Sequence, residues 1–208
     1  MVEAAALVLA AGASSRLGRP KQLVEWGGRP LLERVVAATL AWPVTRVVVV
    51  LGSDAEDVLE RVDLGGADAA INEGWEEGIA SSLRVGLDVL SRESSVDWAF
   101  VALGDQPRIP VDVPGGLLDA AEYCGYPAVV PHYRYQRGNP VLVNRSLWQR
   151  MMALSGDIGA APMLTAHPDL VEEVHFDHVP PRDVDTAADL ADLRAGSGFD
   201  DPPTPSGR

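Results

Sequence analysis

Lys21 is the only lysine among the 208 residues of the sequence, whereas arginine occurs 16 times. It follows an apolar run and a stretch of small residues that also contains Arg16 and Arg19. Small residues let backbone N–H groups approach an oxyanion closely, and the cations add charge. Arginine suits planar two-pronged contacts, whereas the lysine ammonium is a compact, rotatable point charge. The segment therefore suggests a phosphate-binding loop; a plain strand–turn–helix connection is the alternative.

A second candidate is Asp105, which lies in Gly104-Asp105-Gln106-Pro107 directly after the apolar run 99–103. A carboxylate at the end of a central strand suits Mg²⁺, which takes hard oxygen donors together with substrate phosphates. A turn-forming aspartate ahead of a proline is the alternative. Asp105 is therefore a candidate metal ligand.

Two more aspartates, Asp183 and Asp185, precede the last predicted helix. Thr186 or Asp185 would cap that helix, with Asp189 as the partner in a capping box. This explains Asp189 better than it explains the pair 183/185. We expect only one of these two carboxylates to face the site.

A fourth segment, 72–83, joins a strand to a helix and contains Asn72, Ser81 and Ser82. Its glycines, its hydroxyls and a free helix N-terminus are suited to contact a base, a ribose or an acceptor phosphate. Ordinary capping by the serines is the alternative.

Short β-branched runs alternate with helical stretches, which predicts an α/β fold with a mostly parallel sheet covered on both faces. The predicted strands are 6–10, 46–51, 69–72, 98–103, 128–131 and 140–143, and the predicted helices are 31–41, 55–62, 79–90, 116–123, 147–154 and 186–194. We expect one domain over residues 1–195, followed by a disordered tail at 196–208 that is poor in core-forming residues.

The formal net charge of −13 argues against a general nucleic-acid binder. Cys124 is the sole cysteine, so neither an intrachain disulfide nor a thiolate metal cage can form, and a reducing compartment fits. No apolar run reaches the roughly 18 residues of a membrane span, and the N-terminus lacks the layout of a signal peptide. The expected location is the cytoplasm.

Two further residue sets are weaker candidates. His175 and His178 flank Asp177, but such a short cluster on an extended segment is a poor metal site. Core packing explains Trp75 better than stacking on a flat acceptor such as a pterin does.

Taken together, the chain resembles the MobA-like nucleotidyltransferase family, and within it the molybdenum-cofactor cytidylyltransferase branch. The resemblance spans about residues 5–195, with six motifs in order. They are the loop Leu9–Lys21, Asn72 with Gly78-Ile79-Ala80-Ser81-Ser82-Leu83, Gly104-Asp105-Gln106-Pro107, Gly138-Asn139-Pro140-Val141, Gly156-Asp157-Ile158-Gly159 and Asp183-Val184-Asp185-Thr186.

The resemblance implies a single-domain, three-layer α/β/α Rossmann-like sandwich that transfers CMP from CTP to the phosphate of molybdopterin and releases pyrophosphate. Lys21, Arg16 and Asp105 would be catalytic, and Asp105 and Asp185 would hold Mg²⁺. Ala11 favours CTP over GTP. The implied nucleotide contacts are Leu9, Ala10, Ala11, Gly12, Ala13, Ser14, Ser15, Arg16, Lys21, Asn72, Ser81, Ser82, Gly104 and Asp105. A molybdoenzyme or a chaperone would be a transient partner.

The chain departs from the family pattern at three positions, and the first two lie where the family reaches its acceptor. Ala161 replaces a usual arginine, Asn139 replaces a usual histidine, and Ala187 replaces a usual proline. A sugar phosphate, an isoprenoid phosphate or phospholactate could replace molybdopterin as the acceptor, and GTP could replace CTP as the donor.

Two functions without nucleotidyl transfer also fit the family. One is a non-catalytic nucleotide sensor or delivery chaperone, although a binder need not keep Lys21, Asp105 and Asp185 together. The second is an oxidoreductase, since some relatives carry names such as nicotine blue oxidoreductase. The absence of a GxGxxG motif counts against it.

Overall fold

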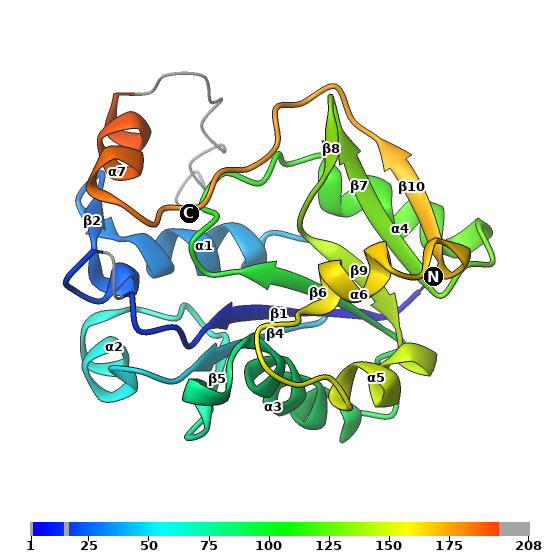
Figure 1. Ribbon diagram of the computed structural model, residues 1–208, viewed down its shortest axis with the longest axis horizontal. Coiled ribbons are helices and arrows are strands. Elements are labelled where there is room, and N and C mark those ends of the chain that lie inside the picture. The colour runs from blue at the N-terminus through cyan, green and yellow to red at the C-terminus, as the bar shows by residue number, and fades with distance from the viewer. Residues whose placement is uncertain (1, 15–16, 196–208) are drawn as a thin grey trace.

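The computed structural model describes residues 2–14 and 17–195. A central sheet carries helices on both faces, so the chain forms three layers (Figure 1). The predicted α/β sandwich is confirmed. Ser15, Arg16 and the tail 196–208 lie outside the described residues, so the predictions made for them are not addressed by the structure.

Within the described residues, eight strands form the central sheet, in the order β10-β7-β9-β6-β1-β4-β5, with β8 paired to β7. The neighbours are parallel except for β9, which runs antiparallel to β6 and β7, and β8, which runs antiparallel to β7. The strands are β1 Ala4–Ala10, β4 Arg46–Leu51, β5 Asp68–Ile71, β6 Trp98–Leu103, β7 Ala128–Tyr133, β8 Gln136–Arg137, β9 Val141–Asn144 and β10 Val171–His175.

The helices divide between the two faces because successive side chains of a buried strand point to opposite sides. In β1, Leu7 packs on the side of α3, α5 and α6, and Val8 packs on the side of α1, α2 and α4. The helices are α1 Leu31–Leu40, α2 Ala55–Arg61, α3 Ile79–Ser91, α4 Val113–Tyr123, α5 Arg145–Met152, α6 Ala160–Thr165 and α7 Ala187–Arg194. Single 3₁₀ turns are η1 Lys21–Leu23, η2 Trp75–Glu77 and η3 Pro168–Leu170.

A short hairpin, β2 Glu25–Trp26 and β3 Arg29–Pro30, lies beside α7 (Figure 1). Trp26, Leu31, Val184 and Leu190 form a small core between them. Helix α7 begins with the predicted capping box. The Thr186 hydroxyl accepts from the backbone N–H of Asp189, and the Asp189 carboxylate accepts from the N–H of Thr186. Leu17, from the loop that carries Lys21, also packs against this small core.

All the predicted strands and helices are present, with ends that differ by at most a few residues. The elements that the sequence did not predict are short or chemically mixed. Strand β10 carries two glutamates at the sheet edge, and α6 contains Pro162. In the described part of the chain, no helix has the length and apolar character needed to cross a membrane.

Candidate functional site

The loops after β1 and β6 start side by side. These strands are parallel neighbours, and Leu9 pairs with Leu103 in the register. Gly104 is required here because a Cβ at this position would lie 2.7 Å from the Cβ of Ala10. The close approach of the two strand ends therefore places the small-residue loop against the loop that carries Asp105.

The segment that carries Asp183 and Asp185 is attached to the Asp105 loop by a backbone hydrogen bond. The N–H of Val184 donates to the carbonyl of Asp105 at 3.0 Å. Residues 181–185 have no regular secondary structure, so Asp183 and Asp185, which would share a face on a regular strand, take different partners. Asp183 accepts a 2.7 Å hydrogen bond from the Gln106 amide, and Asp185 faces Lys21. Of the two carboxylates, that of Asp185 contacts Lys21.

Lys21 is where the three loops meet. Its ammonium donates to Oδ2 of Asp105 and, at 3.1 Å, to Oδ1 of Asp185. The side chains of Lys21 and Asp105 are only 18% and 14% exposed, whereas that of Asp185 is 38% exposed. A single cation thus lies between two carboxylates, one largely buried and one open to solvent.

Burial shapes the electrostatics of this cluster. Burial raises the pKa of the Asp105 carboxyl; the Lys21 ammonium opposes this rise, and the charges of Asp183 and Asp185 add to it. For Lys21, burial would lower the pKa, but the ion pairs and hydrogen bonds with Asp105 and Asp185 outweigh it and raise the pKa. The cluster therefore needs a cation.

The structure also tests whether the carboxylates fit a divalent ion. Oδ1 of Asp105 is buried and has no hydrogen-bond partner among the described residues. An unpartnered carboxylate oxygen is available as a metal ligand, and hard oxygen donors are what Mg²⁺ takes. Within residues 2–14 and 17–195 no group of three or more His, Cys, Asp or Glu side chains is arranged to hold an ion. Substrate oxygens and water would have to complete the coordination, as is usual for Mg²⁺.

An open cleft of ≈ 380 Å³ lies in front of Lys21 and Asp105. Of the predicted nucleotide contacts, those that line it are Leu9, Ala10, Ala11, Gly12, Ala13, Lys21, Ser82, Gly104 and Asp105. The cleft is lined in addition by Gln22, Trp75, Glu76, Gly78, Ile79, Leu103 and Asp157. Trp75 therefore borders the same space as the loop that carries Lys21.

Three of the predicted contacts, Ser14, Asn72 and Ser81, are not among the residues that line the cleft. Asn72 and Ser81 are buried, and the Asn72 amide donates to the hydroxyls of Ser81 at 2.7 Å and Ser82 at 3.0 Å. The Ser14 hydroxyl accepts from the backbone N–H of Lys21 at 2.9 Å. These side chains hold the wall and the lysine in place. Ser15 and Arg16 lie outside the described residues.

Gln22 has a role that the sequence reasoning missed. It is 2% exposed, and its amide donates to the carbonyls of Ala10 at 2.7 Å and Gly12 at 3.1 Å. Both bonds engage carbonyls of the loop, so they fix its backbone beside the cleft. A glutamine directly after the lone lysine was the available signal.

Asp157 belongs to one of the six motifs but was not predicted as a site residue. Gly78, at φ +103°, allows the approach, because a Cβ there would lie 2.5 Å from the carbonyl carbon of Gly156. The backbone N–H of Ala80 also donates to the carbonyl of Gly156 at 3.1 Å. This contact brings the segment before α6 to the cleft.

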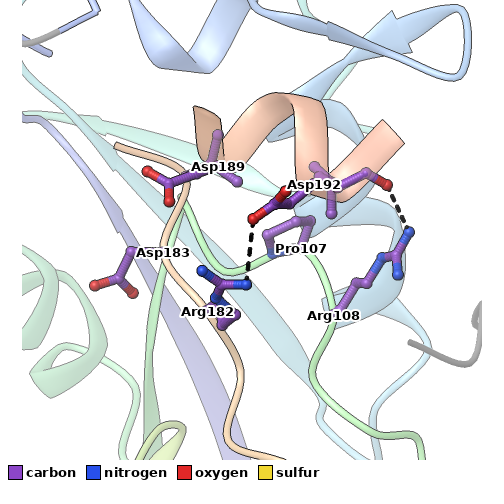
Figure 2. Close-up of a pocket in the computed structure, with 8 residues that line it drawn as sticks. Pro107, Arg108, Arg182, Asp183, Asp189 and Asp192 are labelled. Atoms are coloured by element: carbon purple, nitrogen blue, oxygen red, sulfur yellow. Dashed lines mark hydrogen bonds and ion pairs between the residues drawn. The ribbon is translucent and has the colours of Figure 1, made fainter. Parts of the chain in front are cut away.

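Figure 2 shows a second, much smaller hollow behind the Asp105 loop, of only ≈ 10 Å³. Arg108 donates to the carbonyl of Leu193 at 2.9 Å, and Arg182 pairs with Asp192 at 3.5 Å, so both arginines attach α7 to the rest of the site. The hollow is large enough for about one water molecule. The hollow is a small gap between α7 and the loops at Pro107 and Arg182, and it is too small for a nucleotide.

The weaker histidine candidates separate in the structure. The ring of His175 packs on His132 with centroids 4.6 Å apart, whereas His178 bonds the carboxylate of Asp112 at 2.9 Å. The two therefore take different partners.

Most of the chain matches a known protein family. Residues 6–171 match the model of the MobA-like NTP transferase domain. The chain belongs to this family. A similar protein is nicotine blue oxidoreductase of Paenarthrobacter nicotinovorans, 32% identical over 192 residues that cover 88% of this chain and 93% of the relative.

Two solved structures are similar over nearly the whole chain. The Rv0371c homologue of Mycobacterium sp. strain JC1 is 32% identical, with a TM-score of 0.84 over 93% of this chain and 96% of that one. Rv0371c of Mycobacterium tuberculosis H37Rv, in complex with manganese, is 25% identical, with a TM-score of 0.81 over 93% and 99%. A relative with a similar fold is therefore known in complex with manganese.

Proposed function

We propose that the chain is a metal-dependent nucleotidyltransferase that moves a nucleotidyl group from a nucleoside triphosphate to a phosphorylated acceptor and releases pyrophosphate. The observation that carries the proposal is the contact of Lys21 with Asp105 and Asp185 at the border of the ≈ 380 Å³ cleft. Three loops that are distant in the sequence supply one ammonium and two carboxylates to one point. A triphosphate with its magnesium ion needs both kinds of charge.

An acceptor phosphate is itself an anionic nucleophile, so the chain need not supply a general base. Its task is to bring two anions together and to absorb the charge that develops on the leaving pyrophosphate. Lys21, Arg16 and the N–H groups of the loop that Gln22 holds would bind the departing phosphates. Asp105 and Asp185 would hold Mg²⁺, which supplies charge neutralisation between the phosphate oxygens.

For the substrates we propose CTP and molybdopterin as the first pair to test. Ala11 and the order of the six motifs support CTP and the molybdenum-cofactor branch. The substitutions at Asn139 and Ala161 weigh against a standard acceptor site. The names of the three similar proteins described above state no nucleotide. GTP as donor and a different phosphorylated acceptor are therefore part of the proposal.

A second candidate function comes from the relative in Paenarthrobacter nicotinovorans, whose name states an oxidoreductase activity. The similarity covers most of both chains. A redox reaction by this chain would need an electron-carrying cofactor in the same cleft. Titration with NADH and NADPH, followed by fluorescence, tests this directly.

The deciding experiment measures pyrophosphate release with Mg²⁺ and each of the four common nucleoside triphosphates. Each donor is offered molybdopterin, a sugar phosphate, an isoprenoid phosphate or phospholactate. Release that depends on one donor and one acceptor supports the proposal and names both. If no pair gives release and a nicotinamide cofactor binds in the micromolar range, the oxidoreductase function replaces it.

A further inference from the structure

The Lys21 ammonium contacts carboxylates in the structure, whereas the proposed function requires it to contact a triphosphate. The inference below rests on that proposed function. In the structure Lys21 binds Asp105 and Asp185. In the proposed reaction the same lysine binds a triphosphate, and the same aspartates hold a divalent ion. A cation cannot sit between the two carboxylates while the ammonium is there, so the lysine must change partners.

The carboxylates explain why the ammonium lies where it does. Asp105 is largely buried, and Asp183 and Asp185 add negative charge next to it. Like charges brought together in a buried place are unfavourable without a cation. The Lys21 ammonium reaches both Asp105 and Asp185, so it meets this need in the metal-free protein.

The local structure allows the side chain to move while its backbone stays. The backbone N–H of Lys21 is held by the Ser14 hydroxyl, and residue 21 begins the turn η1. The neighbouring Gln22 is fixed to the loop by two hydrogen bonds. The four-carbon stem of lysine carries its charge on rotatable bonds, and Lys21 itself lines the cleft. The ammonium can therefore turn from the carboxylates to a ligand in the cleft.

We propose that the Lys21 ammonium occupies the position of the divalent ion in the metal-free protein and is exchanged onto the triphosphate when nucleotide and metal bind. The metal competes with an internal cation as long as the cleft is empty. A triphosphate that takes up the ammonium removes this competition. Metal and nucleotide affinities are thereby coupled, and the coupling is reciprocal.

The test is a calorimetric titration with Mn²⁺ in the absence of nucleotide. The proteins are the wild type, Lys21→Met, which keeps the length of the side chain without its charge, and Arg19→Met as the matched control. Arg19 is an exposed cation two residues away. We expect Lys21→Met to bind Mn²⁺ about tenfold more tightly than the wild type, and Arg19→Met to bind it about as the wild type does.

A double variant identifies the carboxylate that binds the ion, and unfolding measurements check that the variants are folded. Adding Asp105→Asn to the Lys21→Met variant should abolish the gain, which places the ion at the Asp105 carboxylate. Circular dichroism and thermal unfolding check that each variant is folded. If Mn²⁺ stabilises Lys21→Met against unfolding more than it stabilises the wild type, the exchange is supported without a calorimetric signal.

Three results would overturn the proposal. These are equal or weaker Mn²⁺ binding by folded Lys21→Met, an equal gain in Arg19→Met, and a gain that survives Asp105→Asn. None of these readouts uses turnover. Failure of nucleotidyl transfer would show as absent pyrophosphate release with the Mn²⁺ exchange intact, so the two proposals fail separately.

Discussion

The ammonium of Lys21 donates to the carboxylate of Asp105, a residue 84 positions away in the sequence. The contact follows from the sheet, because β1 and β6 are parallel neighbours whose loops leave from the same edge. Lys21 comes from the first loop and Asp105 from the second. The pair links the proposed phosphate contact, Lys21, to the proposed metal ligand, Asp105.

Lys21→Ala should lower turnover by about two decades or more, equivalent to about 2.7 kcal/mol of transition-state stabilisation. The fold should remain, since the side chain lies at the border of the cleft rather than within either sheet core. Steady-state pyrophosphate release measures the turnover, and far-ultraviolet circular dichroism checks the fold. Turnover like that of the wild type would remove the phosphate role from this lysine.

Gln22→Leu should weaken nucleotide binding and lower stability together. The substitution removes the two donors that hold the carbonyls of Ala10 and Gly12, and each unsatisfied buried group costs roughly 1–3 kcal/mol. We expect a raised KM for the nucleotide and a lower melting temperature. Gln136→Leu, at an exposed position of β8, is the control. A stability loss without any change in KM would limit Gln22 to a structural role.

Asp183 should act by positioning Asp185 rather than by holding the metal. Its carboxylate accepts from the Gln106 amide, and an asparagine oxygen can accept the same bond. Asp183→Ala should therefore weaken Mn²⁺ binding and turnover about tenfold, the usual scale for a residue that orients a ligand, while Asp183→Asn stays close to the wild type. Equal losses in both variants would show that the charge of Asp183 matters instead.

A pH effect is expected far from the cleft, at Glu173 on β10. Hydrogen bonds from Arg137 and His132 lower the pKa of this carboxyl from 4.5 to about 2. Because the folded-state pKa is lower than the unfolded one, the pairing stabilises the fold above pH 4.5, and the contribution is lost as the pH falls toward 2.

Glu173→Gln should accordingly reduce the free energy of unfolding at neutral pH by roughly 1 kcal/mol, a modest amount because the pair is partly exposed. The difference from the wild type should shrink as the pH falls through this window. Chemical denaturation at a series of pH values measures it, with Glu172→Gln on the other side of the strand as control. A difference that is constant with pH would contradict the ionic origin.

Much of the fold could be predicted because its strands are nearly continuous apolar runs, such as Val47-Val48-Val49-Val50-Leu51. These match a sheet buried on both faces. Strand β10 escaped prediction because its Val171-Glu172-Glu173-Val174-His175 pattern fits an edge strand only once its partner β7 is known. The antiparallel direction of β9 likewise depends on pairing between distant segments.

At the site, residue type and position led to Lys21 and Asp105, whereas the family resemblance led to Asp185. The structure brings these three together. The sequence did not lead to Gln22 and Asp157. Gln22 acts through hydrogen bonds to backbone carbonyls. Asp157 reaches the cleft only because the N–H of Ala80 at the start of α3 bonds the carbonyl of Gly156. Such contacts depend on tertiary packing, which motif spacing does not encode.

The measurement that tests the central claim most directly compares pyrophosphate release by the wild type and by Asp105→Asn. Both are assayed with Mg²⁺, the preferred nucleoside triphosphate and its phosphorylated acceptor. The account predicts release by the wild type and a loss of about two decades or more in the folded variant, because one of the two carboxylates at the cation position becomes neutral. Equal rates in the two proteins would contradict it.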